Sequence, residues 1–161
     1  MIDVVAAVFR DGENRVLIAQ RNIKKDHGGF WEFPGGKVEE KETRKQAIVR
    51  EIKEELDLDI SADRIFCQIP FHYPDGKEIN LIGIECTILS GNLKLLEHED
   101  AQWVKIEELN KWKLTLPDVN ISVILREGLK SKDGKPEYAR ITKGKFEDVP
   151  SFLTMNEVIM Y

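Results

Sequence analysis

Cysteine and histidine are scarce in this chain of 161 residues. Only Cys67 and Cys86 occur, neither in a CxxC or other metal-ligand spacing, so one disulfide is the most that they could form. We expect both to be buried thiols. His27, His72 and His98 lie far apart in the sequence, and we assign them no metal site and no chemistry.

A long hydrophobic run is also missing. No stretch approaches the roughly 18 apolar residues that a membrane span requires. Residues 1–5 do not form a basic segment followed by a long apolar run, as a targeting signal would. We therefore expect a cytoplasmic protein that has no membrane partner.

No large excess of one charge is present either. The 24 Lys and Arg against 29 Asp and Glu give a net charge of -5. This field offers no sequence-independent attraction to duplex nucleic acid, so a polyanionic ligand must be drawn in locally, by a few cations or by metal ions. The length and the 42% hydrophobic content fit one globular unit and exclude a disordered chain.

Short apolar segments separated by turn residues predict strands, and two longer segments predict helices. The expected strands are residues 2–9, 16–19, 65–71, 79–89 and 102–106, and the expected helices are about residues 42–57 and 117–130. The first two strands should pair around Asp11-Gly12. Residues 21–33 are expected to form a loop, Pro34-Gly35-Gly36 a turn, and residues 107–109 a short helical turn.

The first expected helix carries three acids on one side. At about 100° per residue, Glu51, Glu54 and Glu55 fall within one arc, apart from the apolar residues of the same helix. Like charges at this spacing destabilise a helix by a few tenths of a kcal/mol per pair, so a cation is expected among them. Mg²⁺ prefers such oxygen ligands. A solvated acidic face is the simpler alternative.

Neighbouring residues favour the metal interpretation. Arg50 lies one turn before Glu54 and can pair with it, which would orient one ligand. Gly35 and Gly36 allow a close approach of backbone to a ligand, and a carbonyl there can complete an oxygen shell. A solvated face gives no reason for this glycine pair or for the acid at position 42.

The spacing resembles that of a known family. Gly36, five residues, Glu42, seven residues and then residues 50–58 closely resemble the Nudix box, except that the box has Gly where this chain has Asp57. Asp tolerates the left-handed conformation that Gly usually supplies there, at a cost of ~1 kcal/mol. Residues 31–37 resemble the MutT-like branch, the nucleoside triphosphate pyrophosphohydrolases. The similarity extends over about residues 2–130.

This resemblance implies an α/β fold of the Nudix type, an alpha/beta/alpha sandwich with a mixed sheet, over residues 1–130. Residues 131–161 lie outside it as an extension of unknown role. The resemblance also implies dependence on Mg²⁺, with Mn²⁺ as an alternative. The implied metal ligands are Gly36, Glu51, Glu54, Glu55 and Glu97.

The resemblance also assigns catalytic roles. The implied catalytic residues are Arg50, Glu51, Glu54 and Glu97. Arg50 would orient the carboxylates, and either Glu51 or Glu97 would be the base. Two alternatives stay open: Glu97 is an ordinary loop charge, or Glu99 takes its role.

Four residues are expected to contact the substrate: Arg21, Phe33, Lys37 and Asp118. Arg21 and Lys37 would bind phosphate, although surface solvation explains both equally simply. Phe33 is expected in the core together with Trp31 and Trp103, and it matches a position at the edge of the nucleotide pocket. Asp118 would either read a base or complement the dipole of its helix. An ionised Asp suits guanine, its oxidised form or cytosine, because it only accepts hydrogen bonds.

The resulting prediction is a Mg²⁺-dependent hydrolase that converts a nucleoside triphosphate into nucleoside monophosphate and pyrophosphate. Two alternatives remain: hydrolysis of another nucleoside diphosphate compound, such as a nucleotide sugar or dinucleoside polyphosphate, and a nucleotide-sensing module without turnover. The expected partner is a nucleotide, and the protein would be a monomer or a homodimer.

Overall fold

A mixed five-stranded sheet forms the centre of the fold. The structure is a computed structural model that describes residues 1–130 and 159–160. The strand order is β4 (Gly35–Lys37), β1 (Ile2–Phe9), β6 (Glu78–Ser90), β5 (Asp59–His72) and β8 (Ile159–Met160). β1 runs parallel to β6, and every other neighbour pair is antiparallel. β1 is therefore an interior strand of this sheet, paired on both edges.

A second, three-stranded antiparallel sheet lies beside the first. Its order is β3 (Trp31–Glu32), β2 (Arg15–Gln20) and β7 (Asp100–Lys105). A 3₁₀ helix, η1 (Ile106–Lys111), follows β7 directly. The chain thus leaves the second sheet close to the start of the last helix.

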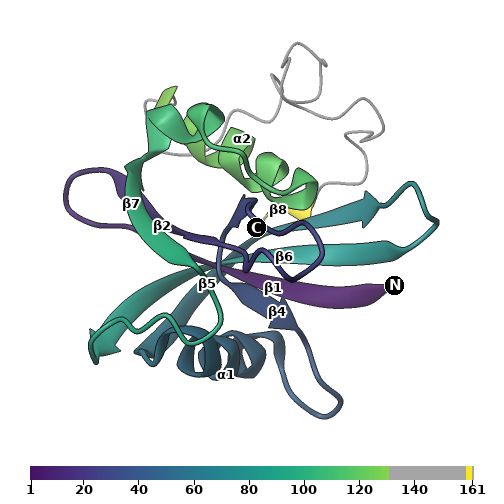
Figure 1. The fold of residues 1–161 in the computed structure, drawn as a ribbon, viewed down its shortest axis with the longest axis horizontal. Helices are drawn as coiled ribbons and strands as arrows, with labels where there is room; N and C mark the ends of the chain where they lie inside the picture. The colour runs from purple at the N-terminus through teal and green to yellow at the C-terminus, as the bar shows by residue number, and fades with distance from the viewer. Residues whose placement is uncertain (131–158, 161) are drawn as a thin grey trace.

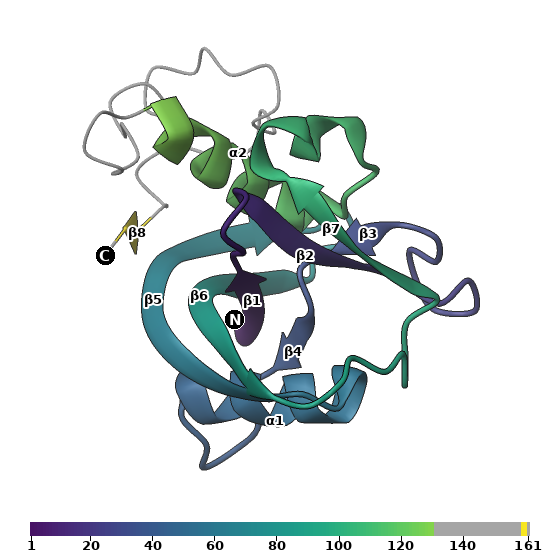
Figure 2. The same cartoon turned by 90° about the vertical axis from the view of Figure 1, so that its left-hand side faces the viewer.

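The two α-helices, α1 (Arg44–Leu56) and α2 (Leu116–Lys130), cover opposite sides of the molecule, as Figures 1 and 2 both show. β1 contributes side chains to the hydrophobic cores on both sides of the sheet, because successive side chains of a strand point to opposite faces. Ala6 and Val8 join the cluster under α2, whereas Val5, Ala7 and Phe9 join the cluster under α1. This arrangement confirms the predicted alpha/beta/alpha sandwich.

The ends of α1 are fixed by local interactions. Thr43 accepts a hydrogen bond from the Gln46 backbone N–H and gives its own N–H to the Gln46 side chain, which makes a capping box. At the other end, Asp57 adopts the left-handed conformation, with φ 55° and ψ 39°. Its carboxylate lies 3.2 Å from Lys53 and 3.3 Å from Lys94. The expectation that Asp takes over the role of the motif glycine is confirmed.

Other expectations need correction. Residues 2–9 and 16–19 are strands but do not form a hairpin, because each lies in a different sheet and one isolated bridge, Arg10 to Val16, joins them. Gly35 and Gly36 form strand β4 rather than a turn, and the loop expected over residues 21–33 ends in β3. Trp103 is 36% exposed and not a core residue. Its strand lies at the edge of the second sheet.

The remaining elements lie close to their predicted positions. The strands expected at 65–71 and 79–89 extend to β5 and β6, and the expected helical turn is η1. Nearly all of the extension, residues 131–158 and 161, lies outside the described residues. Within the described part of the chain, no helix is long and apolar enough to cross a membrane.

The left-handed end of α1 generates a stability prediction. We expect the Asp57→Gly variant to be more stable than Asp57→Ala by about 1 kcal/mol, because only glycine adopts this conformation without a steric cost. Both variants lose the two lysine contacts, so the comparison isolates the backbone term. Urea unfolding measures the difference. Equal stabilities would contradict it.

Candidate functional site

A pocket of about 200 Å³ opens between β4, α1 and the segment that precedes β7. The residues that line it are Arg21, Asn22, Lys25, Glu32, Gly35, Gly36, Glu51, Glu55, Glu97 and His98. Four carboxylates therefore face two cationic side chains in a small space. They come from four separate regions of the chain, which the fold brings together.

Two α1 carboxylates of this pocket are largely buried. The Glu55 side chain is 6% exposed, and the Glu51 side chain is 15% exposed. Burial raises the pKa of Glu55 to about 10, and the charges of Glu32, Glu51 and Glu97 act in the same direction. Burial also raises the pKa of Glu51, against the opposing effect of Arg50. The pocket therefore disfavours negative charge unless a cation compensates it.

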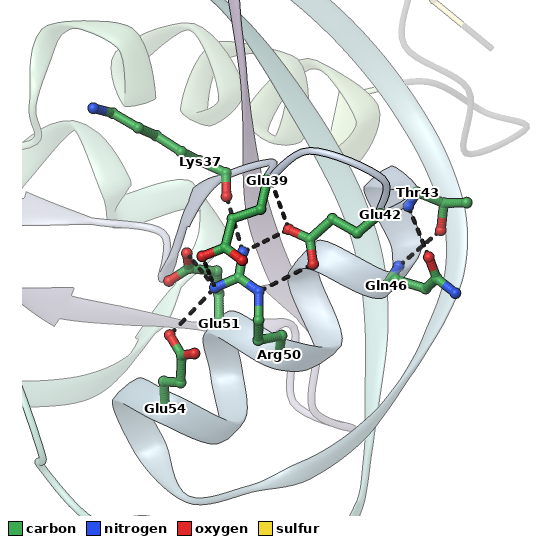
Figure 3. A network of polar contacts seen from close by, with 8 residues as sticks. All are labelled: Lys37, Glu39, Glu42, Thr43, Gln46, Arg50, Glu51 and Glu54. Atoms are coloured by element: carbon green, nitrogen blue, oxygen red, sulfur yellow. Dashed lines mark hydrogen bonds and ion pairs between the residues drawn. The ribbon is translucent and has the colours of Figure 1, made fainter.

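Arg50 holds the acids at the mouth of this pocket (Figure 3). Its guanidinium contacts both Glu42 oxygens, at 2.6 and 3.0 Å, and lies 3.0 Å from Glu51 and 3.3 Å from Glu54. It also donates to the Lys37 carbonyl at 3.0 Å. The expected pair with Glu54 is present, but Glu42 is the nearer, bidentate partner. Glu42 is also the main reason that the pKa of Arg50 is raised.

Gly36 lies directly against Glu51. A β-carbon added at Gly36 would lie 2.5 Å from Glu51 Oε1, which is too close for any real contact. Any larger residue would displace this carboxylate. The glycine thus leaves room for the Glu51 side chain beside the β4 backbone.

A second network crosses the other side of the pocket. Arg21 Nη1 lies 2.8 Å from Glu32 Oε1, and His98 Nε2 lies 3.0 Å from Glu32 Oε2. His98 Nδ1 is 4.0 Å from Glu55 Oε2. Glu97, the neighbour of His98, lies 3.7 Å from Lys25. One bridging acid, Glu32, thus joins Arg21 to the histidine.

Asp118 occupies a buried position near the start of α2. It is 5% exposed and accepts a hydrogen bond from the Phe33 backbone N–H at 2.7 Å. Burial raises the pKa of Asp118 well above its usual range, with Glu32 adding to the effect. One of its oxygens is already used as an acceptor for the Phe33 N–H. The role of Asp118 as an acceptor for a base stays a prediction.

Comparisons with known proteins identify the family. A family model described as NUDIX domain matches residues 2–124. The chain belongs to the NUDIX family. The CTP pyrophosphohydrolase of Escherichia coli (strain K12) is 37% identical over 122 residues, which are 74% of this chain and 87% of that protein. The 8-oxo-dGTP diphosphatase of Proteus vulgaris is 43% identical over 74 residues, 46% of this chain and 66% of that protein.

A solved structure agrees with this assignment. The crystal structure of a MutT protein from Methanosarcina mazei Go1 matches with a TM-score of 0.71 and 26% identity, over 81% of this chain and 96% of that one. The predicted family, its MutT-like branch and the fold are confirmed. This Nudix chain is accordingly a hydrolase of the pyrophosphohydrolase type.

The Nudix fold brings half of the ten predicted site residues to the pocket. Arg21, Gly36, Glu51, Glu55 and Glu97 line it, and the rival Glu99 is not among its lining residues. The remaining five predicted residues are not among its lining residues either: Phe33, Lys37, Arg50, Glu54 and Asp118. Phe33 is 3% exposed and belongs to the core cluster under α2.

Four pocket residues were not expected from the sequence: Asn22, Lys25, Glu32 and His98. Glu32 and His98 could have been noticed, because each directly adjoins a residue that the resemblance picked out. Asn22 and Lys25 carry no such signal, since they stand in an irregular polar segment.

The donor set of this Nudix pocket fits a divalent metal ion. Glu55 Oε2 is buried and has no hydrogen-bond partner within the described part of the chain. Carboxylate and carbonyl oxygens are the ligands that Mg²⁺ prefers. Among residues 1–130 and 159–160, no three acidic, His or Cys side chains are already grouped as a metal shell. Two of the predicted ligands, Glu51 and Glu54, are paired with Arg50 instead.

The burial of Glu55 generates a pH prediction. Its pKa of about 10 in the folded protein exceeds the ordinary value of 4.5, so folding takes up a proton between these values. This contribution is complete below pH 4.5 and is lost as the pH rises toward 10. In EDTA at pH 8, we expect Glu55→Gln to increase the free energy of unfolding by about 1–3 kcal/mol, because the amide is neutral in both states and avoids the cost of keeping a buried carboxyl protonated above its ordinary pKa.

Urea unfolding at a series of pH values in EDTA measures this effect. The gain should vanish near pH 4. Glu54→Gln is the matched control, because the Glu54 side chain is 52% exposed. A plot of its free energy of unfolding against pH should run parallel to that of the wild type. A Glu55→Gln curve parallel to the wild type would contradict the prediction.

Proposed function

We propose that this Nudix hydrolase cleaves a nucleoside triphosphate to nucleoside monophosphate and pyrophosphate, with Mg²⁺, or Mn²⁺ in its place. One observation carries the proposal: the carboxylates of Glu51, Glu55 and Glu97 share a pocket with Arg21 and Lys25. Acids that hold a cation, opposite basic groups that hold phosphate, form the usual layout for phosphoryl chemistry.

The substrate class that we propose is an oxidised guanine or a cytosine nucleotide. Support comes from two relatives, which are named 8-oxo-dGTP diphosphatase and CTP pyrophosphohydrolase. A buried Asp118 is consistent with both, because guanine presents N–H donors and an acceptor, and cytosine presents an N–H₂ donor.

The cation ligands that we propose are Gly36, through its carbonyl, and the carboxylates of Glu51, Glu54, Glu55 and Glu97. Glu54 borders the outer side of α1, so its participation requires release from Arg50. When bound there, Mg²⁺ supplies charge neutralisation of the diphosphate and polarisation of the bond that breaks. The Gly36 backbone can take part because no side chain lies between it and Glu51.

Glu51 is the proposed general base. Burial raises its pKa, which makes it a stronger proton acceptor than an exposed glutamate, as a base that activates water needs to be. Arg50 holds this carboxylate at 3.0 Å and keeps it oriented. Glu97 is the second candidate, but its side chain is 43% exposed and pairs with Lys25. The more buried acid is the better base, because burial disfavours its charged form.

Arg21 and Lys25 are the proposed phosphate contacts. Glu32 braces Arg21 Nη1 at 2.8 Å, the Asp26 carbonyl accepts from Arg21 Nε at 2.8 Å, and Arg21 lines the pocket. Lys37 is a weaker candidate, because its side chain points away from the acidic network in Figure 3. Phe33 would act through its backbone, whose N–H orients Asp118.

Residues 1–130 are the proposed hydrolase domain, and residues 131–161 are an extension whose role stays a prediction. The cytoplasmic location and the monomeric or homodimeric state also stay predictions. A nucleotide sugar or dinucleoside polyphosphate is the alternative substrate, since the pocket residues would bind any diphosphate.

Turnover tests the proposed function. Glu51→Gln should keep the fold and lower kcat by about 10²–10⁴-fold, the contribution of a positioned base. Glu54→Gln should instead raise the Mg²⁺ concentration needed for half activity. Released pyrophosphate is measured over a nucleotide panel with Mg²⁺. Glu40→Gln, an exposed loop acid, is the control. Wild-type protein that binds nucleotide without turnover would point to a sensing module and overturn the proposal.

Base selection gives a separate prediction. Asp118→Asn hardly changes the side-chain volume. The Asn carbonyl oxygen can still accept from the Phe33 N–H, but an NH₂ group that only donates replaces the second carboxylate oxygen. We expect kcat/KM for guanine or cytosine substrates to fall relative to other bases by about 1–3 kcal/mol. The Mg²⁺ dependence should not change. An unchanged substrate ranking would remove Asp118 from base recognition.

A further inference from the structure

We propose that His98 is a positioning residue that joins the phosphate side of the pocket to its cation side. Through Glu32 it fixes Arg21, and on its other edge it supports Glu55. The inference rests on the proposed function in one respect, that Glu55 helps to hold the divalent cation.

The contacts on the first edge are direct. The His98 side chain is 5% exposed, and its Nε2 lies 3.0 Å from Glu32 Oε2. The other oxygen of Glu32 lies 2.8 Å from Arg21 Nη1. One carboxylate thus receives both groups, so the orientation of Arg21 depends on a residue that lies 77 positions later in the sequence.

The second edge faces Glu55. His98 Nδ1 and Glu55 Oε2 lie 4.0 Å apart, and both are buried without a hydrogen-bond partner among the residues that the structure describes. Buried polar atoms are rarely left without a partner, and such exceptions gather at functional sites. The two atoms face the same small space, so the imidazole limits the positions that the Glu55 carboxylate can take.

The backbone around His98 is anchored on both sides. The Leu96 N–H donates to the Glu55 carbonyl at 3.1 Å, and the Glu99 N–H donates to the Gln20 carbonyl at 2.9 Å. His98 is therefore held between α1 and β2. An imidazole fixed in this way positions its neighbours and also places Glu97 at the pocket wall.

Binding of Mn²⁺ alone, without nucleotide, tests the proposal. Free Mn²⁺ is followed by electron paramagnetic resonance as it is titrated into wild-type and variant protein. Loss of residues that orient metal ligands typically weakens metal binding 10–100-fold. We expect a loss in this range for His98→Ala. A purely structural histidine would lower the melting temperature and leave the Mn²⁺ affinity of the folded protein unchanged.

Two further variants separate the two edges. His98→Gln places an amide near the Nε2 position and should keep the Glu32 contact, so the KM for nucleotide should stay near that of the wild type while Mn²⁺ binding weakens. His98→Asn places its amide near the Nδ1 position, so it should raise the KM for nucleotide while Mn²⁺ binding stays near that of the wild type. These variants also replace His98→Ala if the smaller side chain does not fold.

The matched control is His72→Ala. His72 also contacts a glutamate at 3.0 Å, but it lies in the β5–β6 hairpin and its side chain is 40% exposed. Its removal should not change Mn²⁺ affinity. Equal Mn²⁺ affinities in the wild type and in all folded His98 variants would overturn the inference. Absence of turnover in the wild type itself would instead defeat the proposed function and leave the Mn²⁺ comparison intact.

Discussion

The burial of several carboxylates in one pocket is the constraint on which the rest of this structure depends. Glu51, Glu55 and Glu32 are all largely removed from water, where their charges are costly. The surrounding residues offset this cost for some of the acids but not for all of them. Arginines pair with the acids at the edges, whereas Glu55 in the centre has one oxygen without a hydrogen-bond partner in the described residues.

Helix α1 meets this constraint through its two faces. Ile48, Ile52 and Leu56 are fully buried against the mixed sheet and fix the rotation of the helix. Glu51 and Glu55 then point toward β4 and the segment before β7, whereas Glu54 borders the outer side of the helix. Arg50 forms ion pairs with Glu42, Glu51 and Glu54. Its positive charge offsets the repulsion between these carboxylates. The same rotation that fills the core thus assembles the site.

Local pattern determined a large part of the architecture and the site. Hydrophobic periodicity placed both α-helices and the long strands, because burial selects residues at fixed intervals. The Nudix spacing indicated the acids of α1, and the left-handed end at Asp57 followed from steric preference alone. The pairing of β1 with β6 could not be predicted in this way, since each residue of β1 lies 77 positions before its partner in β6.

The sequence by itself determined the family, the acidic helix and the chemical type of the site, because these depend on residue identity and short-range spacing. Only the tertiary structure decided which acids are buried, that Glu32 and His98 join Arg21 to the Glu55 side, and that Asp118 is buried with a raised pKa. The physical reason is that burial and electrostatic coupling depend on distances between segments, and the fold brings Arg21, Glu32 and His98 together from three parts of the chain.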